Sequence, residues 1–144
     1  MKIFIACDHA AFEAKEALRQ HLEGKHELKD LGTYSLDSVH YPDYAMKLSE
    51  AVLQHPGSRG VLLCGSGIGV SIVANRFKGI RAALCRDVDD AKMCRLHNDA
   101  NVICLAGRKT PIETLKPMVD TFLATEFEGG RHAQRLDLFA QLGQ

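Results

Sequence analysis

Short apolar runs alternate with amphipathic stretches along the whole chain. Runs of consecutive apolar residues are typical of strands, and the most continuous ones are typical of strands buried on both faces. Five segments are predicted to be strands, at residues 2–6, 26–32, 60–64, 79–85 and 101–107. The run at 60–64 is the most apolar of them. The segment at 26–32 is more polar, so we place it at an edge of the sheet.

The stretches between these strands repeat their apolar residues at a spacing of three or four, which is typical of helices. Six helices are predicted, at residues 11–22, 45–52, 70–77, 87–97, 111–123 and 130–142. Thr110 and Pro111 suit the start of the fifth helix, as its N-cap and its first residue. Pro117 lies inside that helix and predicts either a kink or a late start. Residues 33–42 show no period and are predicted to be irregular.

The order of these elements, with strand and helix in alternation, predicts a parallel sheet with helices on both faces. The expected fold class is therefore α/β, a three-layer, Rossmann-like α/β/α sandwich with a five-stranded parallel sheet. No linker, internal repeat or low-complexity tract interrupts the sequence, so we expect one domain over residues 1–144. Ligands of such sheets bind beyond the carboxyl ends of the strands. The residues that follow each strand are therefore the first candidates for a site.

The charge of the chain narrows the classes of partner. Eighteen lysine and arginine residues balance eighteen aspartate and glutamate residues, for a formal net charge of zero. A neutral chain has no general attraction to nucleic acid or to an anionic membrane, so we expect neither as a partner. A bound anion must then be held by a local cluster of donors. The amino-terminal apolar run is too short for a signal peptide or a membrane span, and we expect a cytoplasmic protein.

The strongest local motif is the segment CGSGIG at residues 64–69, which follows a buried strand and opens a helix. Its three glycines let the backbone turn tightly and direct N–H groups into one concavity, which suits an oxyanion or a phosphate. The alternative is a dinucleotide fingerprint, G-x-G-x-x-G. That pattern requires glycine where this chain has Val70, and the turn after the first strand contains no glycine.

The five cysteines are an odd number and include no C-x-x-C pair. Cys7, Cys85 and Cys104 lie in or beside apolar runs, and we interpret them as small buried side chains in a reducing compartment. Cys64 differs because it ends a strand beside the glycine loop. Clustered N–H groups and a helix N-terminus favour a thiolate, which makes Cys64 a candidate general base. The alternative is that Cys64 also serves only in packing.

Two histidines lie at edges where a site is expected. His9 follows Asp8 at the end of the first strand, and Asp8 either belongs to the site or caps the next helix. His97, followed by Asn98, lies where a helix leads into the last strand. Neither histidine has a second histidine or a cysteine at metal-ligand spacing, so we expect no metal.

The last helix begins with two arginines, Arg131 and Arg135, that are four residues apart. Side chains at this spacing share one helix face, so both guanidinium groups could converge on one phosphate. The alternative is a solvated basic face. Arg108, just past the last strand, is a third candidate donor.

Together these segments resemble the type B ribose-5-phosphate isomerases, within the wider family that includes galactose-6-phosphate isomerase. The resemblance covers essentially the whole chain. Five blocks in the same order carry it: CDHAAFEAK at 7–15, YPDYA at 41–45, LLCGSGIGVSIVANRFKGIRA at 62–82, RLHNDANV at 95–102 and EGGRHAQR at 128–135. It implies a homodimer with active sites at the subunit interface, and it leaves open a further assembly into a tetramer.

The resemblance implies a reaction without a cofactor on a small phosphorylated sugar, namely ribose 5-phosphate to ribulose 5-phosphate through a cis-enediolate. Cys64 would be the base, Ser66 and the loop N–H groups would stabilise the oxyanion, and His97 would open the furanose ring. The residues implied to bind the substrate are Asp8, His9, Tyr41, Gly65, Ser66, Gly67, Ile68, Gly69, Asn98, Arg108, Arg131 and Arg135. Three of the implied site residues, His97, Asn98 and Arg108, are expected from the neighbouring subunit.

Two departures from the family pattern bear on the base. Some members lack the cysteine and carry a glutamate just after the glycine loop, where this chain has Val70, so Cys64 is left as the base. Many cysteine-type members have threonine where this chain has Ser66, which retains the hydroxyl. Two other functions stay open: an isomerase of a six-carbon sugar 6-phosphate such as allose or galactose 6-phosphate, and a non-catalytic phosphosugar-binding module.

Overall fold

Five parallel strands form one sheet in the computed structural model, which describes residues 1–144. The order of the strands across the sheet is β2-β1-β3-β5-β4. Their bounds are β1 Lys2–Cys7, β2 Glu27–Asp30, β3 Arg59–Cys64, β4 Ala82–Leu84 and β5 Val102–Ala106. The predicted five-stranded parallel sheet is confirmed, and the polar strand β2 lies at an edge as expected.

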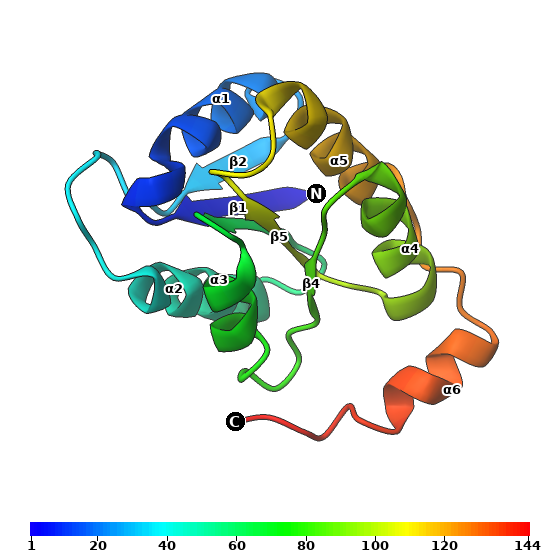
Figure 1. The fold of residues 1–144 in the computed structure, drawn as a ribbon. Helices are drawn as coiled ribbons and strands as arrows, with labels where there is room; N and C mark the ends of the chain where they lie inside the picture. The colour runs from blue at the N-terminus through cyan, green and yellow to red at the C-terminus, as the bar shows by residue number, and fades with distance from the viewer.

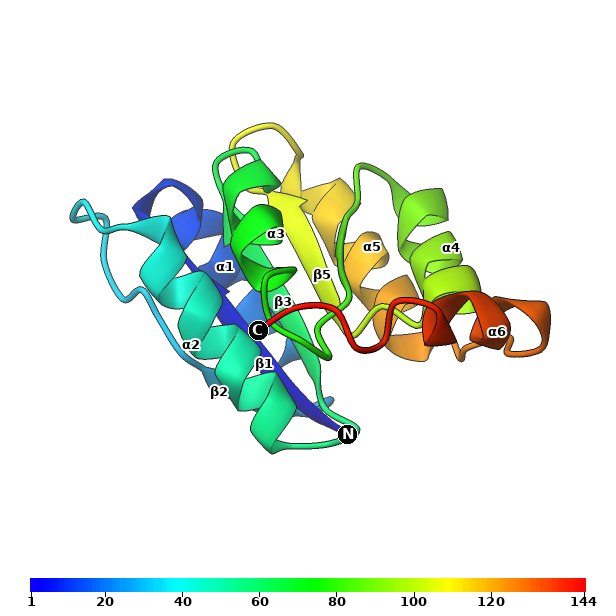
Figure 2. The same ribbon diagram turned by 90° about the horizontal axis from the view of Figure 1, so that it is seen from below.

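Helices cover both faces of this sheet, so the predicted three-layer sandwich is also confirmed (Figure 1). The helices are α1 Phe12–Leu22, α2 Tyr41–Gln54, α3 Ile68–Ala74, α4 Val88–Asn98, α5 Ile112–Ala124 and α6 Arg131–Asp137. Helices α1, α4 and α5 pack on one face, and α2 and α3 pack on the other. Helix α6 lies outside the sandwich, where it contacts α4 (Figure 2).

Each face of the sheet has its own apolar core. Neighbouring residues of a strand point to opposite faces, so Ile3 and Ile5 pack with Phe122 of α5 while Phe4 packs with Leu48 of α2. Burial of one such side chain contributes about 1.5–3 kcal/mol. All six residues of β3 are buried, which explains why the run from Gly60 to Cys64 is apolar. The carboxyl end of this central strand therefore has a fixed position, and the glycine loop begins there.

Several elements differ in length from the prediction. Helix α3 begins at Ile68 and ends at Ala74, because Gly67 takes a left-handed φ of 76° before it and short i to i+3 turns follow it. The predicted strand 79–85 is reduced to β4, which is an edge strand that pairs with β5 alone. The predicted last helix, 130–142, ends at Asp137 and continues as turns with i to i+3 bonds.

Three prolines also have positions that differ from the prediction. Helix α2 begins within the segment predicted to be irregular and has Pro42 in its first turn, where the missing N–H has no helical partner to lose. Pro111, and not Thr110, is the N-cap residue of α5. This helix does not start late, because it runs from Ile112 through Pro117 to Ala124. Pro117 lies on the exposed side of the helix, where water can compensate for the lost bond.

None of the helices is of a length and apolar character that would let it cross a membrane.

Candidate active site

A cleft of about 690 Å³ opens at the carboxyl ends of β1, β3 and β5. Its lining comes from four segments that are distant in the sequence. The lining residues are Asp8, His9, Ala10, Tyr41, Cys64, Gly65, Ser66, Ile68, Gly69, Ile72, Arg108 and Lys109. Most of the predicted site residues therefore share one cleft, at the edge of the sheet where ligands of this fold class bind.

Cys64 ends β3 at the floor of this cleft and is 5 % exposed. Its Sγ accepts a hydrogen bond from the backbone N–H of Gly67 at 3.2 Å. A Cβ at Gly67 would lie 2.7 Å from the Leu84 side chain and 3.0 Å from the Leu105 backbone. Glycine is therefore required for the turn that brings this N–H to the sulfur. An N–H donor at sulfur stabilises the negative charge of a thiolate.

The glycine loop has free donors beside Cys64. The backbone N–H groups of Gly65 and Ser66 make no hydrogen bond within the chain, whereas that of Ile68 donates to the Ser66 Oγ at 3.2 Å. Gly69 lets the Tyr41 ring approach, because a Cβ there would lie 2.6 Å from Tyr41 Cε1. The loop therefore presents two N–H groups and one hydroxyl to the cleft, an arrangement that suits a developing oxyanion.

The end of β1 contributes two polar side chains. Asp8 Oδ1 accepts the N–H of Ala10 at 3.0 Å, so Asp8 caps the short 3-10 helix His9–Ala11 and lines the cleft at the same time. His9 Nδ1 accepts the N–H of Val39 at 3.1 Å. In a neutral imidazole with this bond, Nε2 carries the proton. His9 can therefore donate a hydrogen bond to an anion.

Arg108 lies in the cleft of its own chain, which differs from the prediction that the neighbouring subunit supplies it. Its backbone N–H donates to the Gly65 carbonyl at 3.1 Å, and its Cδ lies 3.4 Å from the position of a Cβ at Gly65. The next residue, Lys109, also lines the cleft and was missed in the sequence. Its place in the loop that follows β5, three residues after Ala106, was the available signal, since such loops contribute ligand-facing side chains.

Five predicted site residues do not line this cleft: Gly67, which lies against Leu84 and Leu105, and four residues of α4 and α6. His97 and Asn98 end α4, and the exposed Arg131 and Arg135 lie on α6. In Figure 2, α6 is at the lower right, far from the loop that joins β3 to α3 at the top. Within one chain, the two arginines therefore do not converge on an anion at Cys64.

His97 instead contacts a residue that the sequence did not single out, His132 of α6. The two imidazole rings stack with centroids 4.4 Å apart and an interplanar angle of 17°. With Glu128 they form the one group of potential metal ligands, whose ligand atoms lie within 4.8 Å of one another. Nearly parallel rings do not direct their in-plane lone pairs to one point, so a tetrahedral ion would require a ring to turn. The absence of a metal stays a prediction.

Cys7, Cys85 and Cys104 are held in their thiol forms, whereas the hydrogen bond from Cys85 lowers the pKa of Cys94. Burial raises the pKa of Cys7 to about 12 and also raises the pKa of Cys104. The hydrogen bond from Cys85 Sγ to Cys94 Sγ, at 3.9 Å, raises the pKa of Cys85. Of the five, Cys64 alone lines the cleft.

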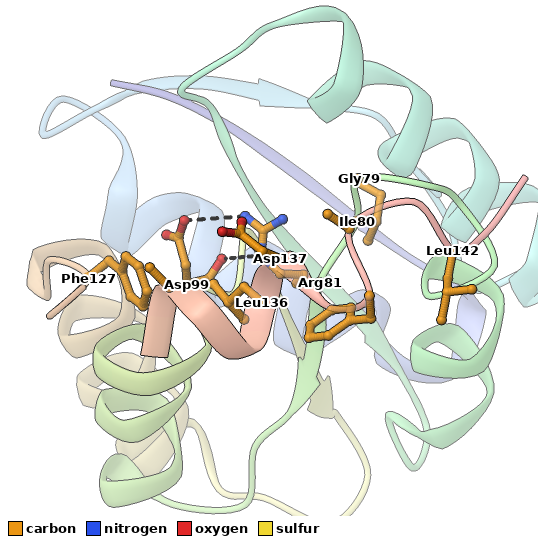
Figure 3. A pocket seen from close by; sticks show the side chains of 11 residues that line it. Gly79, Ile80, Arg81, Asp99, Phe127, Leu136, Asp137 and Leu142 are labelled. Carbon is orange, nitrogen blue, oxygen red and sulfur yellow. Dashed lines mark hydrogen bonds and ion pairs between the residues drawn. The ribbon is translucent and has the colours of Figure 1, made fainter. Parts of the chain in front are cut away.

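A second cavity, of about 290 Å³, lies where α6 and the last residues cover the edge of the domain (Figure 3). Arg81 crosses it and pairs with Asp99, with its Nη2 3.3 Å from Asp99 Oδ2. Phe127, Leu136 and other apolar side chains form much of the remaining wall. None of the predicted site residues lines this cavity. Its lining residues come from the carboxyl-terminal segment and from the part of the domain that this segment covers.

Comparison with known proteins agrees with this geometry. A family model described as Ribose/Galactose Isomerase matches residues 3–139. The ribose-5-phosphate isomerase B of Escherichia coli K12 is 40 % identical over 144 residues, which are 99 % of this chain and 97 % of that protein. A ribose 5-phosphate isomerase from Thermotoga maritima superposes with a TM-score of 0.95 at 51 % identity, over 98 % of each chain.

One similar structure contains a ligand. Ribose-5-phosphate isomerase B from Mycoplasma genitalium, with bound ribulose-5-phosphate, has a TM-score of 0.94 and 38 % identity over 97 % of this chain and 94 % of that one. The fold, the cleft and these relatives together define an aldose–ketose isomerase of sugar phosphates. The chain belongs to the ribose/galactose isomerase family.

Proposed function

We propose that this enzyme interconverts ribose 5-phosphate and ribulose 5-phosphate through a cis-enediolate, with Cys64 as the base. The observation that carries the proposal is the position of the Cys64 sulfur, at the floor of the cleft and bonded to a loop N–H. The similar Mycoplasma genitalium enzyme with ribulose-5-phosphate bound supports the choice of substrate.

In the proposed reaction, the Cys64 thiolate takes the proton from C2 of the open-chain aldose and returns it to C1, while the hydroxyl proton of O2 passes to O1 in the cis-enediolate and C2 becomes the carbonyl carbon. The negative charge that develops on the carbonyl oxygen is stabilised by the Ser66 hydroxyl and by the free N–H groups of Gly65 and Ser66. A positioned base and an oxyanion site each contribute about two to four orders of magnitude in rate. Val70 is fully buried and carries no ionisable group, which supports Cys64 as the base.

The remaining groups of the cleft suit the rest of the substrate. Asp8 and Tyr41 are placed to bind sugar hydroxyls, while His9 and Arg108 are donors for the phosphate, with the cation of Lys109 beside them. Binding energy from a phosphate remote from the reacting carbons can orient those carbons at the base. No step requires a cofactor.

The proposed active unit is a homodimer with shared active sites, which could assemble further into a tetramer. One chain leaves its cleft without His97, Asn98, Arg131 and Arg135. A second copy could supply these residues, since they are on the surface of the other end of the domain. Ile68 and Ile72, which are 48 % and 60 % exposed at the cleft, are apolar contacts suited to such a partner.

A six-carbon sugar 6-phosphate, such as allose or galactose 6-phosphate, is the second candidate substrate. The open cleft of about 690 Å³ has room for one more carbon, and the family description includes galactose. A non-catalytic phosphosugar-binding module is not supported, because the relatives are isomerases.

A substrate panel tests the proposal. We expect the highest kcat/KM with ribose 5-phosphate, and lower values with allose 6-phosphate and galactose 6-phosphate. Cys64→Ala should bind ribose 5-phosphate with little change and lose turnover. A Cys64→Ala enzyme with full turnover would exclude this residue as the base, and a preference for a hexose phosphate would favour the second candidate.

A further inference from the structure

The contact between α4 and α6 joins a proposed active-site residue to one that the mechanism does not use. His97 lies in the last turn of α4, and its ring stacks on the ring of His132 with the centroids 4.4 Å apart. His132 is 5 % exposed, and its Nε2 is buried without a hydrogen-bond partner. Glu128 is close by, with Oε1 3.5 Å from that Nε2. A buried ring nitrogen without a hydrogen-bond partner destabilises a fold, so packing alone does not account for a histidine at position 132.

The segment that carries His132 is fastened to the end of α4 at two positions. Arg95 Nε donates to the Thr125 carbonyl at 3.0 Å, and the Glu128 backbone N–H donates to the Leu96 carbonyl at 3.1 Å. The second of these bonds is made directly before His97. Together they place the first turn of α6 against the last turn of α4. The backbone therefore brings the two rings into contact.

Nearly parallel stacking favours a positioning role over metal binding. An imidazole coordinates through a lone pair in its own plane, and planes inclined by 17° place two such lone pairs side by side. A flat neighbour instead restricts the rotation of the His97 ring about its side-chain torsions. That restriction matters only if His97 must present one nitrogen to a reacting group.

We propose that His132 is a positioning residue for His97 in the opening of the furanose ring. The inference rests on the proposed function. In ring opening, His97 would remove the proton of the anomeric hydroxyl, the bond from C1 to the ring oxygen would break as the carbonyl forms, and the ring oxygen would receive a proton. Small errors in the position of such a group are expensive in rate, by up to about a hundredfold for 1 Å.

Helix α6 gives this arrangement a second feature. Arg131 precedes His132 directly, and Arg135 lies one turn later on the same short helix. If these arginines bind the phosphate, the element that holds the phosphate also holds the ring that orients His97. Binding of the phosphate and alignment for ring opening would then occur together.

Two variants that fill the same space separate stacking from packing. His132→Phe keeps a flat ring, whereas His132→Leu is apolar and of similar bulk but cannot stack. Gln134→Ala, on an exposed part of α6, is the matched control. Two reactions are measured for each: conversion of ribose 5-phosphate, which requires ring opening, and exchange of the C1 hydrogen of ribulose 5-phosphate with deuterated water. Ribulose 5-phosphate is acyclic, so its exchange requires the base and the oxyanion site but no ring opening.

We expect His132→Leu to lower conversion of ribose 5-phosphate by about tenfold or more, while C1 exchange stays within about twofold of the unmodified enzyme. His132→Phe should recover most of the conversion, and Gln134→Ala should change neither reaction. The inference fails if His132→Leu converts at the original rate, if exchange falls together with conversion, or if His132→Phe falls as far as His132→Leu. An unmodified enzyme that shows neither conversion nor exchange would instead overturn the proposed function.

Discussion

At the scale of single residues, the surroundings decide what each of five buried cysteines can do. Cys7 and Cys104 lie within apolar layers, where burial disfavours the thiolate. Cys85 and Cys94 face one another inside the domain. Cys64 is nearly as buried, but its sulfur faces an open cleft and accepts an N–H. The five thiols should therefore differ strongly in their reactivity with an alkylating reagent, although all five are buried.

Alkylation checks this difference directly. At pH 8, iodoacetamide should modify Cys64 first, because the pKa of Cys7 is raised to about 12 and that thiol stays protonated. Peptide mass spectrometry over time gives the rate at each cysteine. Ribose 5-phosphate should slow the modification of Cys64. Equal rates at Cys7 and Cys64 in folded protein would contradict the expectation.

Lys15 gives a second prediction at this scale. Its side chain is fully buried, and Nζ lies 2.7 Å from Asp30 Oδ2 and 3.1 Å from Glu16 Oε1. Burial by itself lowers the pKa of Lys15, but the bonds to Asp30 and Glu16 outweigh that effect and raise it. Asp30→Asn keeps an oxygen for the Gly32 N–H and removes the charge. The buried cation then loses its main partner.

We expect Asp30→Asn to lower the free energy of unfolding by about 3 kcal/mol, measured with urea. The control is Glu27→Gln on the same strand, which removes the exposed Lys2–Glu27 pair at 3.8 Å. That change should cost less than about 1 kcal/mol. A similar loss for the two variants would mean that the Lys15–Asp30 pair contributes no more than a surface pair.

At the scale of elements, the site depends on how one strand ends and one helix begins. The turn between β3 and α3 requires a left-handed residue at Gly67, in close contact with β5. Other glycines in the chain share that conformation without any neighbour, such as Gly57, which has a φ of 88° and no atom within 4 Å of an added Cβ. The two positions therefore separate backbone strain from displacement of the site.

Gly57→Ala should cost about 1–2 kcal/mol of stability, from the left-handed backbone alone, and leave turnover intact. Gly67→Ala should cost more and should also lower kcat, because its Cβ would push the loop away from the Leu105 backbone and move the N–H bonded to Cys64. Urea unfolding and the isomerase assay measure both effects. Unchanged kcat in Gly67→Ala would show that the sulfur does not depend on this turn.

The elements also show what the sequence could and could not predict. The glycine loop was placed correctly because an apolar run such as residues 60–64 is expected to be buried on both faces of the sheet, which fixes where the loop begins. The ends of β4 and α6 were not predicted correctly. The limits of edge and surface elements depend on contacts that give no repeating pattern of apolar residues in the sequence. The contact of His132 with His97 was missed for the same reason, since it depends on how α6 folds back onto α4 across 35 positions. Asp8 and Tyr41 were correctly predicted to lie near Cys64. Arg108 was expected from the neighbouring subunit, whereas it lines the cleft of its own chain.

At the scale of the whole molecule, the residues of the proposed site lie on two opposite sides of the domain. The base lies with the carboxyl ends of the strands, while the proposed ring-opening residue and the α6 arginines lie at the other side of the domain. A homodimer with shared active sites reconciles this division, because each cleft would be completed by the other copy.

Mixed dimers test that assembly. Cys64→Ala and His97→Asn should each have little activity with ribose 5-phosphate. When the two are refolded together, a mixed dimer has one site with both residues intact, and random pairing restores about a quarter of the original activity. Mixing Cys64→Ala with Cys64→Ala, His97→Asn double mutant chains should restore nothing. A mixture no more active than its components would place both residues in one chain's site.

The stacked pair on α4 and α6 lies far from the sulfur of its own chain, and this separation has a kinetic consequence. If each cleft takes its ring-opening group from the other chain, the active species is the dimer. At high dilution the dimer dissociates, so the rate then depends on the protein concentration to a power above one. A single chain would then contain every residue that the reaction needs and would still be unable to open the furanose ring.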